Sequence, residues 1–200
     1  MRNQNLAKRV LSLRLLILDV DGVLTDGGII YNSEGIEYKR FDVKDGLGLV
    51  MLRAMGINTA IITGRRSNIV DLRAKDIGID IVMQSFPIKL PAYQKLKDEM
   101  KLSDECIGFI GDDLIDLDVM RHVGFAVAPA DAHPAVRSSA HYICKANGGA
   151  RAIRETIDLI MAFRYGEFGP IDYIPVELLE RWQDVVWEHL SGNSPAKEGQ

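Results

Sequence analysis

The sequence is poor in cysteine and has no cluster of metal-binding histidines. Cys106 and Cys144 are the only cysteines among the 200 residues, and no CxxC pair occurs. A disulfide framework or a structural zinc site needs more cysteines at shorter spacing, so we expect neither. The four histidines show no ligand spacing, and we interpret all of them as structural or surface residues: His122, His133, His141 and His189.

Long hydrophobic runs and excess positive charge are also missing. No stretch approaches the ~20 apolar residues that a membrane-spanning helix needs. The basic N-terminal segment precedes an apolar run, but Arg14 lies within that run and no small-residue cleavage site follows, which excludes a secretory signal. We therefore expect a cytoplasmic protein with no membrane contact. The formal net charge of -4 argues against nucleic-acid binding.

The sequence does contain an alternation of short apolar runs with helical patterns. Continuous apolar runs predict buried parallel strands at 15–18, 59–62, 79–83, 107–110, 125–127 and 142–144. Helical patterns predict helices at 47–55, 68–77, 88–100, 114–123 and 150–163. Strand, helix and strand repeats are typical of βαβ units. We expect an α/β fold with one doubly wound, Rossmann-like parallel sheet and helices on both faces.

Residues 28–41 interrupt this alternation just after the first predicted strand. Two β-rich stretches flank the turn sequence NSEG at 32–35, which predicts a β-hairpin. A hairpin this short cannot bury a core of its own, so it is solvated, or it forms an oligomer contact or an active-site rim. We expect a core domain over 1–163 and a C-terminal tail over 164–200 with an amphipathic helix at about 176–190.

Carboxylates follow two of the predicted buried strands. Asp19 and Asp21 come directly after the first strand, and Asp112 and Asp113 follow strand 107–110, with Asp116 one helical turn later. Ligands of open α/β sheets bind beyond the carboxyl ends of the strands, and buried carboxylates need a compensating cation. The pattern predicts an all-oxygen pocket for a hard cation, with Mg²⁺ as the preferred ion.

Two other binding motifs do not fit these acidic residues. An EF-hand calcium loop requires an oxygen ligand at loop position 5 and glycine at position 6, whereas Val23 takes position 5 and Gly22 position 4. A dinucleotide site requires GxGxxG after the first strand, and none follows it.

Polar residues at other predicted strand and helix ends complete the pattern. Thr63, Gly64 and Arg65 follow strand 59–62, and Lys89 opens a helix, where a cation is unfavourable unless an anion is near. Each residue also has a structural interpretation: Thr63 and Asp113 as helix caps and Lys89 as a surface lysine. The order DxD, T, K, DD on successive elements favours one shared site.

The segments DVDGVLTD, IITGR and GDDLID, with the lysine between the last two, resemble the four motifs of the haloacid dehalogenase-like phosphatases over residues 15–161. FDVKDG and VAPADAHP extend the resemblance to the capless subgroup typified by 3-deoxy-D-manno-octulosonate 8-phosphate phosphatases. This resemblance implies a Mg²⁺-dependent phosphatase of lipopolysaccharide-precursor synthesis without a cap domain, and a homotetramer formed through the hairpin. The alternatives are a phosphatase of a nine-carbon sugar-acid 9-phosphate and a catalytically silent regulatory module.

The resemblance also implies a role for each motif residue. Asp19 is the expected nucleophile, which forms an aspartyl-phosphate, and Asp21 the expected proton donor, with its backbone carbonyl on the metal. Asp112 completes the metal ligands, while Asp113 and Asp116 orient them. Thr63 and Lys89 are expected to hold the phosphate. The expected sugar-acid contacts are Asp42, Val43, Lys44, Asp45, Gly46, Gly64, Arg65, Arg73 and Lys89.

Arg65 and Arg73 form a guanidinium pair suited to the substrate carboxylate, although Arg73 also fits a solvated helix position. The chain departs from the subgroup at Val50, where arginine is usual, and at Ser85, where glycine usually follows the glutamine.

Overall fold

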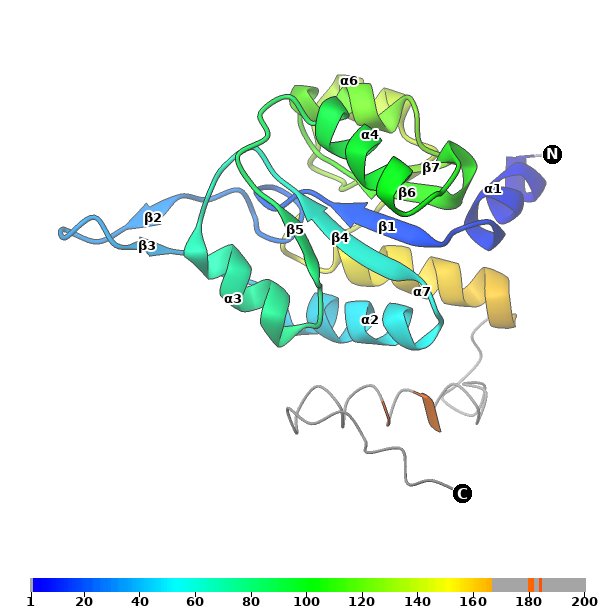
Figure 1. The fold of residues 1–200 in the computed structure, drawn as a ribbon, viewed down its shortest axis with the longest axis horizontal. Helices are drawn as coiled ribbons and strands as arrows, with labels where there is room; N and C mark the ends of the chain where they lie inside the picture. The colour runs from blue at the N-terminus through cyan, green and yellow to red at the C-terminus, as the bar shows by residue number, and fades with distance from the viewer. Residues whose placement is uncertain (1, 167–179, 182–183, 185–200) are drawn as a thin grey trace.

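A six-stranded parallel sheet forms the centre of the molecule (Figure 1). This computed structural model describes residues 2–166, 180, 181 and 184. The strand order is β5-β4-β1-β6-β7-β8, and every neighbouring pair is parallel. The α/β fold predicted from the sequence is thus confirmed. The strands are β1 (Leu15–Leu18), β4 (Asn58–Ile62), β5 (Ile81–Met83), β6 (Ile107–Ile110), β7 (Phe125–Ala128) and β8 (Tyr142–Ile143).

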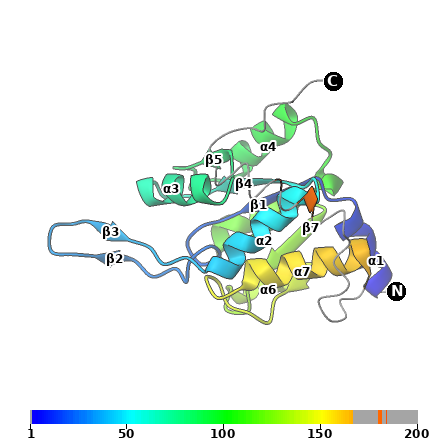
Figure 2. The same ribbon diagram turned by 90° about the horizontal axis from the view of Figure 1, so that it is seen from below.

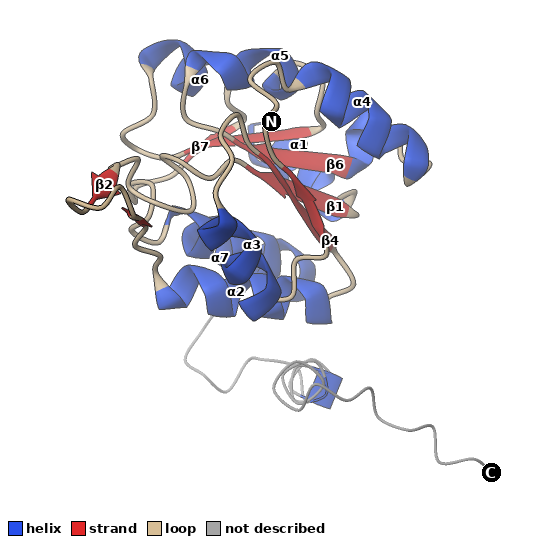
Figure 3. Ribbon diagram, turned by 60° about the vertical axis from the view of Figure 1, so that its left-hand side comes forward, coloured by secondary structure: helices blue, strands red, loops and turns tan. Residues whose placement is uncertain are grey.

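Helices cover both faces of this sheet (Figure 3). One layer contains α2 (Val43–Ala54), α3 (Asn68–Asp76) and α7 (Ala152–Tyr165), and the other contains α4 (Leu90–Glu99), α5 (Leu117–Met120) and α6 (Pro134–Ser139). Side chains alternate between the two layers along β1: Leu16 and Leu18 join the α2 and α7 core, whereas Leu15 and Ile17 join the α4 and α5 core. Because both faces of the sheet are buried, the sequence of β1 is a continuous apolar run.

Four helical segments differ from the sequence-based prediction. Helix α2 begins four residues earlier than predicted, because Asp42 Oδ1 accepts a hydrogen bond from Lys44 N at 2.7 Å and caps it. The predicted helix 114–123 is instead a 3₁₀ turn (Leu114–Asp116) followed by the single turn of α5. Helices α1 (Arg2–Leu11) and α6 were not predicted; α6 has only 6 residues, too few to show a helical period.

The segment between β1 and α2 forms the predicted hairpin, which projects from the body of the molecule (Figure 2). Strands β2 (Ile30–Tyr31) and β3 (Glu37–Tyr38) pair antiparallel, with Ile30 opposite Tyr38. At the turn, Asn32 Oδ1 accepts hydrogen bonds from the backbone N of Glu34 and Ile36 at 3.0 and 2.8 Å. This side chain takes the place of backbone partners, as in an Asx turn.

The predicted tail helix at about 176–190 lies outside the described residues, apart from Glu180, Arg181 and Asp184. Among the described residues, no helix has the length and apolar character needed to cross a membrane.

Candidate active site

Three neighbouring strands end in the polar residues that the sequence singled out. Strand β1 pairs with β4 on one side and β6 on the other, so Asp19 lies between the chain segments that carry Thr63 and Asp112. Because the strands are parallel, their carboxyl ends meet at one edge of the sheet. Asp19 and Thr63 are buried there, with exposed fractions of 5% and 2%.

A lysine from another element neutralises part of this acidic edge. Lys89 Nζ lies 2.8 Å from Asp19 Oδ1 and 2.5 Å from Asp116 Oδ1, and its side chain is fully buried. The surface interpretation of Lys89 is therefore excluded. A buried ammonium without these partners would carry a large desolvation cost, so the three residues form one charge cluster.

Asp19, Asp112 and Asp116 each offer a carboxylate oxygen within 4.8 Å of the other two. Burial raises the pKa of Asp112 to about 8, with a further contribution from the charges of Asp19 and Asp116. Burial also raises the pKa of Asp19 to about 6, although the neighbouring Lys89 opposes the shift. Ionisation of Asp112 beside Asp19 is therefore unfavourable near neutral pH unless a further cation binds.

Two buried oxygens in this cluster lack hydrogen-bond donors, as a metal site requires. Asp112 Oδ1 accepts no hydrogen bond from the described residues, and Asp19 Oδ1 has only its ion pair with Lys89. All-oxygen ligands of this kind suit Mg²⁺. Asp19 and Asp112 would therefore hold the ion, as the sequence predicts.

Asp116 and Asp113 shape the loop that carries Asp112. Asp116 Oδ2 accepts hydrogen bonds from the backbone N of Asp112 and Asp113 at 2.9 and 3.2 Å. The Asp113 side chain is exposed and caps the following 3₁₀ turn, so its helix-cap interpretation holds. Thr63 is not a helix cap, because Ser67 takes the N-cap position of α3.

Glycines allow the loops of the site to approach each other closely. Gly22 has φ +92°, and a Cβ atom there would lie 2.0 Å from Asp112 Oδ2. A Cβ atom on Gly148 would lie 1.8 Å from Gly22 O, and Gly149 N donates to Val23 O at 2.9 Å. The Gly148-Gly149 pair was missed by sequence reasoning, although its two adjacent glycines were a visible signal.

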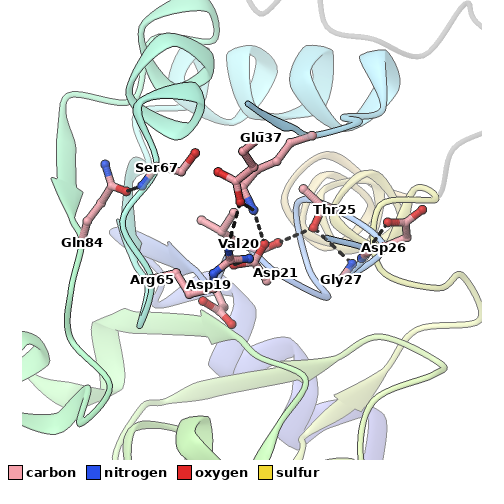
Figure 4. A network of polar contacts seen from close by, with 12 residues as sticks. Asp19, Val20, Asp21, Thr25, Asp26, Gly27, Glu37, Arg65, Ser67 and Gln84 are labelled. Atoms are coloured by element: carbon pink, nitrogen blue, oxygen red, sulfur yellow. Dashed lines mark hydrogen bonds and ion pairs between the residues drawn. The ribbon is translucent and has the colours of Figure 1, made fainter. Parts of the chain in front are cut away.

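The side chain of Asp21 points away from the acidic cluster and toward the hairpin. It pairs with Lys39, and Arg65 Nη1 lies 3.8 Å from its Oδ2. Figure 4 shows Asp21, Arg65 and Glu37 gathered next to Asp19. Sequence reasoning missed Glu37 and Lys39, although their alternation with apolar residues in IEYK indicated a two-sided strand.

Some of the residues expected to contact the sugar acid lie at the start of α2 and next to it. Arg73 is half-buried, with its guanidinium carbon 5.5 Å from the centre of the Phe41 ring and its Nη2 3.3 Å from Asp42 O. It is therefore not a solvated helix arginine. Gly46 is packed against it, since a Cβ there would lie 2.4 Å from Arg73 Nη2. Val43 and Lys44 are exposed at the first turn of α2.

Asp45 and Ser85 have local structural roles. Asp45 is buried and accepts hydrogen bonds from the backbone N of Arg151 and Arg154 at 3.3 and 2.7 Å. These bonds hold the start of α7, so the carboxylate is not available to the predicted sugar pocket. Ser85 has φ +66°, a conformation that favours the glycine usual at this position.

Known proteins that are similar to this chain belong to one family. A family model described as haloacid dehalogenase-like hydrolase matches residues 73–155. The 3-deoxy-D-manno-octulosonate 8-phosphate phosphatase KdsC of Yersinia pestis is 46% identical over 154 residues, which cover 77% of this chain and 82% of that protein.

Two solved structures are also similar. The crystal structure of the Yersinia pestis phosphatase has a TM-score of 0.79 and 43% identity, and the match covers 81% of this chain and 88% of that one. The 3-deoxy-D-manno-octulosonate 8-phosphate phosphatase of Moraxella catarrhalis has a TM-score of 0.78 and 42% identity, and covers 80% of this chain and 92% of that one. That structure is a complex with a magnesium ion, a phosphate ion and a KDO molecule.

Proposed function

The chain belongs to the haloacid dehalogenase-like hydrolases, and from that premise we propose that it removes the phosphate group from 3-deoxy-D-manno-octulosonate 8-phosphate. It is a phosphatase of this family, and Mg²⁺ is its cofactor. The proposed substrate matches the names of the relatives, which are similar over about three quarters of this chain.

Asp19 is the proposed nucleophile. Its carboxylate is buried at the end of β1 and paired with Lys89 at 2.8 Å, which stabilises a negatively charged oxygen at a largely buried position. An oxygen of Asp19 bonds to phosphorus while the bond from phosphorus to the sugar oxygen breaks, giving an aspartyl-phosphate. Water then hydrolyses this intermediate and releases inorganic phosphate.

Charge repulsion between Asp19 and the phosphate dianion is the main barrier to this attack. Lys89 and the Thr63 hydroxyl are positioned to bind phosphoryl oxygens, because both are buried beside Asp19. Asp19, Asp112 and the Asp21 carbonyl would hold Mg²⁺, which would supply the remaining positive charge. Asp112 Oδ1, which accepts no hydrogen bond from the described residues, and Asp19 Oδ1, whose partner is the Lys89 ammonium, support this ligand set.

Asp21 is the proposed proton donor to the departing sugar oxygen. Its side chain lies apart from the metal-binding carboxylates, next to Lys39 and Arg65. In the first step it gives its proton to the sugar oxygen, and in the second step it takes a proton from the attacking water. Asp19 thus acts as the nucleophile, whereas Asp21, two residues later, acts as the acid and base.

The buried Asp19 carboxylate, paired with Lys89 within reach of Asp112 and Asp116, carries this proposal. We expect Asp19→Asn to abolish Mg²⁺-dependent phosphate release, because the amide cannot act as the nucleophile. Asp118→Asn makes the same change at an exposed position on α5 and should keep wild-type activity. Equal rates of phosphate release by wild type and Asp19→Asn would show that Asp19 is not the nucleophile. An inactive wild type would favour the alternative of a catalytically silent regulatory module.

The substrate itself is tested by comparing two sugar-acid phosphates. We expect a higher kcat/KM for the eight-carbon acid 8-phosphate than for a nine-carbon acid 9-phosphate. The reverse order would assign the chain to the nine-carbon alternative.

We also propose a homotetramer assembled through the hairpin, acting in the cytoplasm in lipopolysaccharide-precursor synthesis. The hairpin supports assembly because it exposes a group of large apolar side chains: Ile29, Ile30, Tyr31, Ile36 and Tyr38, each at least half exposed. Monomeric proteins rarely leave such a cluster uncovered.

A further inference from the structure

The second strand of the hairpin turns its polar side chains inward and its apolar ones outward. Ile36 and Tyr38 are each 50% exposed, whereas the Lys39 side chain is 2% exposed and that of Glu37 is 16% exposed. Strand geometry places alternate residues on opposite faces. Glu37 and Lys39 therefore share the face directed at the catalytic loop.

The inward face forms a closed ring of charges around Asp21. Lys39 Nζ contacts Asp21 Oδ1 and lies 3.6 Å from Glu37 Oε1. Glu37 Oε1 accepts a hydrogen bond from Arg65 Nη2 at 2.9 Å, and Arg65 Nη1 lies 3.8 Å from Asp21 Oδ2. Figure 4 shows Glu37 linked to Arg65 close to Asp21.

The buried position of Lys39 makes this contact different from an ordinary surface ion pair. An exposed pair contributes little, because water solvates both charges and the side chains remain mobile. The Lys39 ammonium has lost nearly all its contact with water, so its direct partners Asp21 and Glu37 must replace that solvation. The Asp21 carboxyl is consequently restricted in rotation.

We propose that Lys39 is a positioning residue that fixes the side chain of Asp21 for proton transfer to the leaving group. Lys39 occupies Oδ1, and Arg65 lies beyond hydrogen-bond distance of Oδ2, which leaves Oδ2 available to the sugar oxygen. Correct placement of a catalytic group to within about 1 Å is worth up to ~100-fold in rate. The inference rests on the proposed function, because it requires Asp21 to be the proton donor.

The test replaces Lys39 by methionine, whose unbranched side chain is one atom shorter than that of lysine and carries no charge. Two substrates differ in their need for a proton: the octulosonate phosphate, with a basic leaving oxygen, and p-nitrophenyl phosphate, whose leaving group departs as a stable anion. The value of kcat/KM includes only the steps up to leaving-group departure, and is measured for both.

We expect Lys39→Met to lower kcat/KM for the octulosonate phosphate by about 10-fold to 100-fold. The loss should fall on kcat and leave KM within about threefold, while kcat/KM for p-nitrophenyl phosphate also stays within about threefold. Lys39→Arg retains the cation and should recover part of the loss. Arg40→Met, on the outward face one residue later, is the matched control and should behave as wild type.

Several results would overturn the proposal. These are an equal loss on both substrates, a rise in KM with kcat unchanged, wild-type kinetics of Lys39→Met, or no gain from Lys39→Arg. If circular dichroism shows that Lys39→Met is misfolded, the proposal is tested instead by comparing Lys39→Arg with wild type on the two substrates. Failure of the proposed function is separate: it would appear as activity remaining in Asp19→Asn or as no activity in wild type.

Discussion

At the scale of single residues, Gly22 determines how closely Asp112 approaches the catalytic loop. A methyl group there would lie 2.0 Å from Asp112 Oδ2, and its φ of +92° is also unfavourable for alanine. We expect Gly22→Ala to weaken Mg²⁺ binding by about tenfold or more, measured by titration calorimetry.

Gly35→Ala separates the steric effect from backbone strain. Gly35 has φ +79° and no neighbouring atom within 4 Å of its added Cβ, so this variant has the strain of roughly 1 kcal/mol without the collision. Its Mg²⁺ affinity should be that of wild type. Equal affinities of Gly22→Ala and wild type would contradict the assignment of Asp112 as a ligand.

As a proposed metal ligand, Asp112 should also make Mg²⁺ binding depend on pH. Burial and neighbouring carboxylates raise its pKa to about 8, so the ion must displace a proton below that pH. We expect the affinity to rise by about tenfold per unit between about pH 6 and pH 8. Calorimetry in two buffers of different ionisation enthalpy should detect the released proton, and an affinity independent of pH would contradict the prediction.

The Asp112 carboxyl also affects the stability of the metal-free protein. Between the ordinary pKa of 3.8 and about 8, the folded state keeps a proton on Asp112 that the unfolded chain has released. Stability must therefore fall as the pH rises through this range, because the folded state binds more protons. Asp112→Asn removes the titrating group and should flatten this dependence.

At the scale of elements, the hairpin combines two surfaces with different tasks. Its outward face carries the cross-strand pair Ile30 and Tyr38, 52% and 50% exposed. We expect the double variant Ile30→Asp, Tyr38→Asp to reduce the sedimenting mass, because four charges per pair of hairpins cannot be buried in an interface. Sedimentation velocity measures this change.

Leu72→Asp is the control for the hairpin variant. Leu72 is 65% exposed on α3, so the substitution adds a charge to an exposed apolar position outside the hairpin. It should leave the mass unchanged. A double variant that sediments like wild type would exclude the hairpin as the assembly surface.

At the scale of the whole molecule, helix α7 closes the core beneath the site. Ile157 is fully buried in the cluster formed with α2, and α2 approaches it through Gly48, where a Cβ would lie 3.0 Å from Ile157 Cδ1. We expect Ile157→Ala to lower the free energy of unfolding by about 2–5 kcal/mol, measured by urea denaturation. Leu72→Ala, at an exposed position, should change it by only ~0.5 kcal/mol.

Mg²⁺ affinity should be unaffected by Ile157→Ala under native conditions, since the site lies at the strand ends rather than in this core. A loss of metal binding that matches the loss of stability would indicate that the loops of the site are held mainly by α7.

The sequence by itself determined the sheet, the position of the strand ends and the order of the polar motifs. These features depend on local patterns: apolar runs such as 107–110 form buried strands, and parallel strands place Asp19, Thr63 and Asp112 at one edge. The helical segment after Asp113 was predicted less well, because a capping box tightened its start into a 3₁₀ turn.

Only the tertiary structure decided which side chains meet across long separations. Asp45 binds the start of α7 106 residues away, Lys39 reaches Asp21 across 18 residues, and Gly148 packs on Gly22. No local period records such contacts, because they depend on how whole elements pack against one another. Sequence therefore singled out the proposed reacting groups, whereas the fold determined which residues contact them.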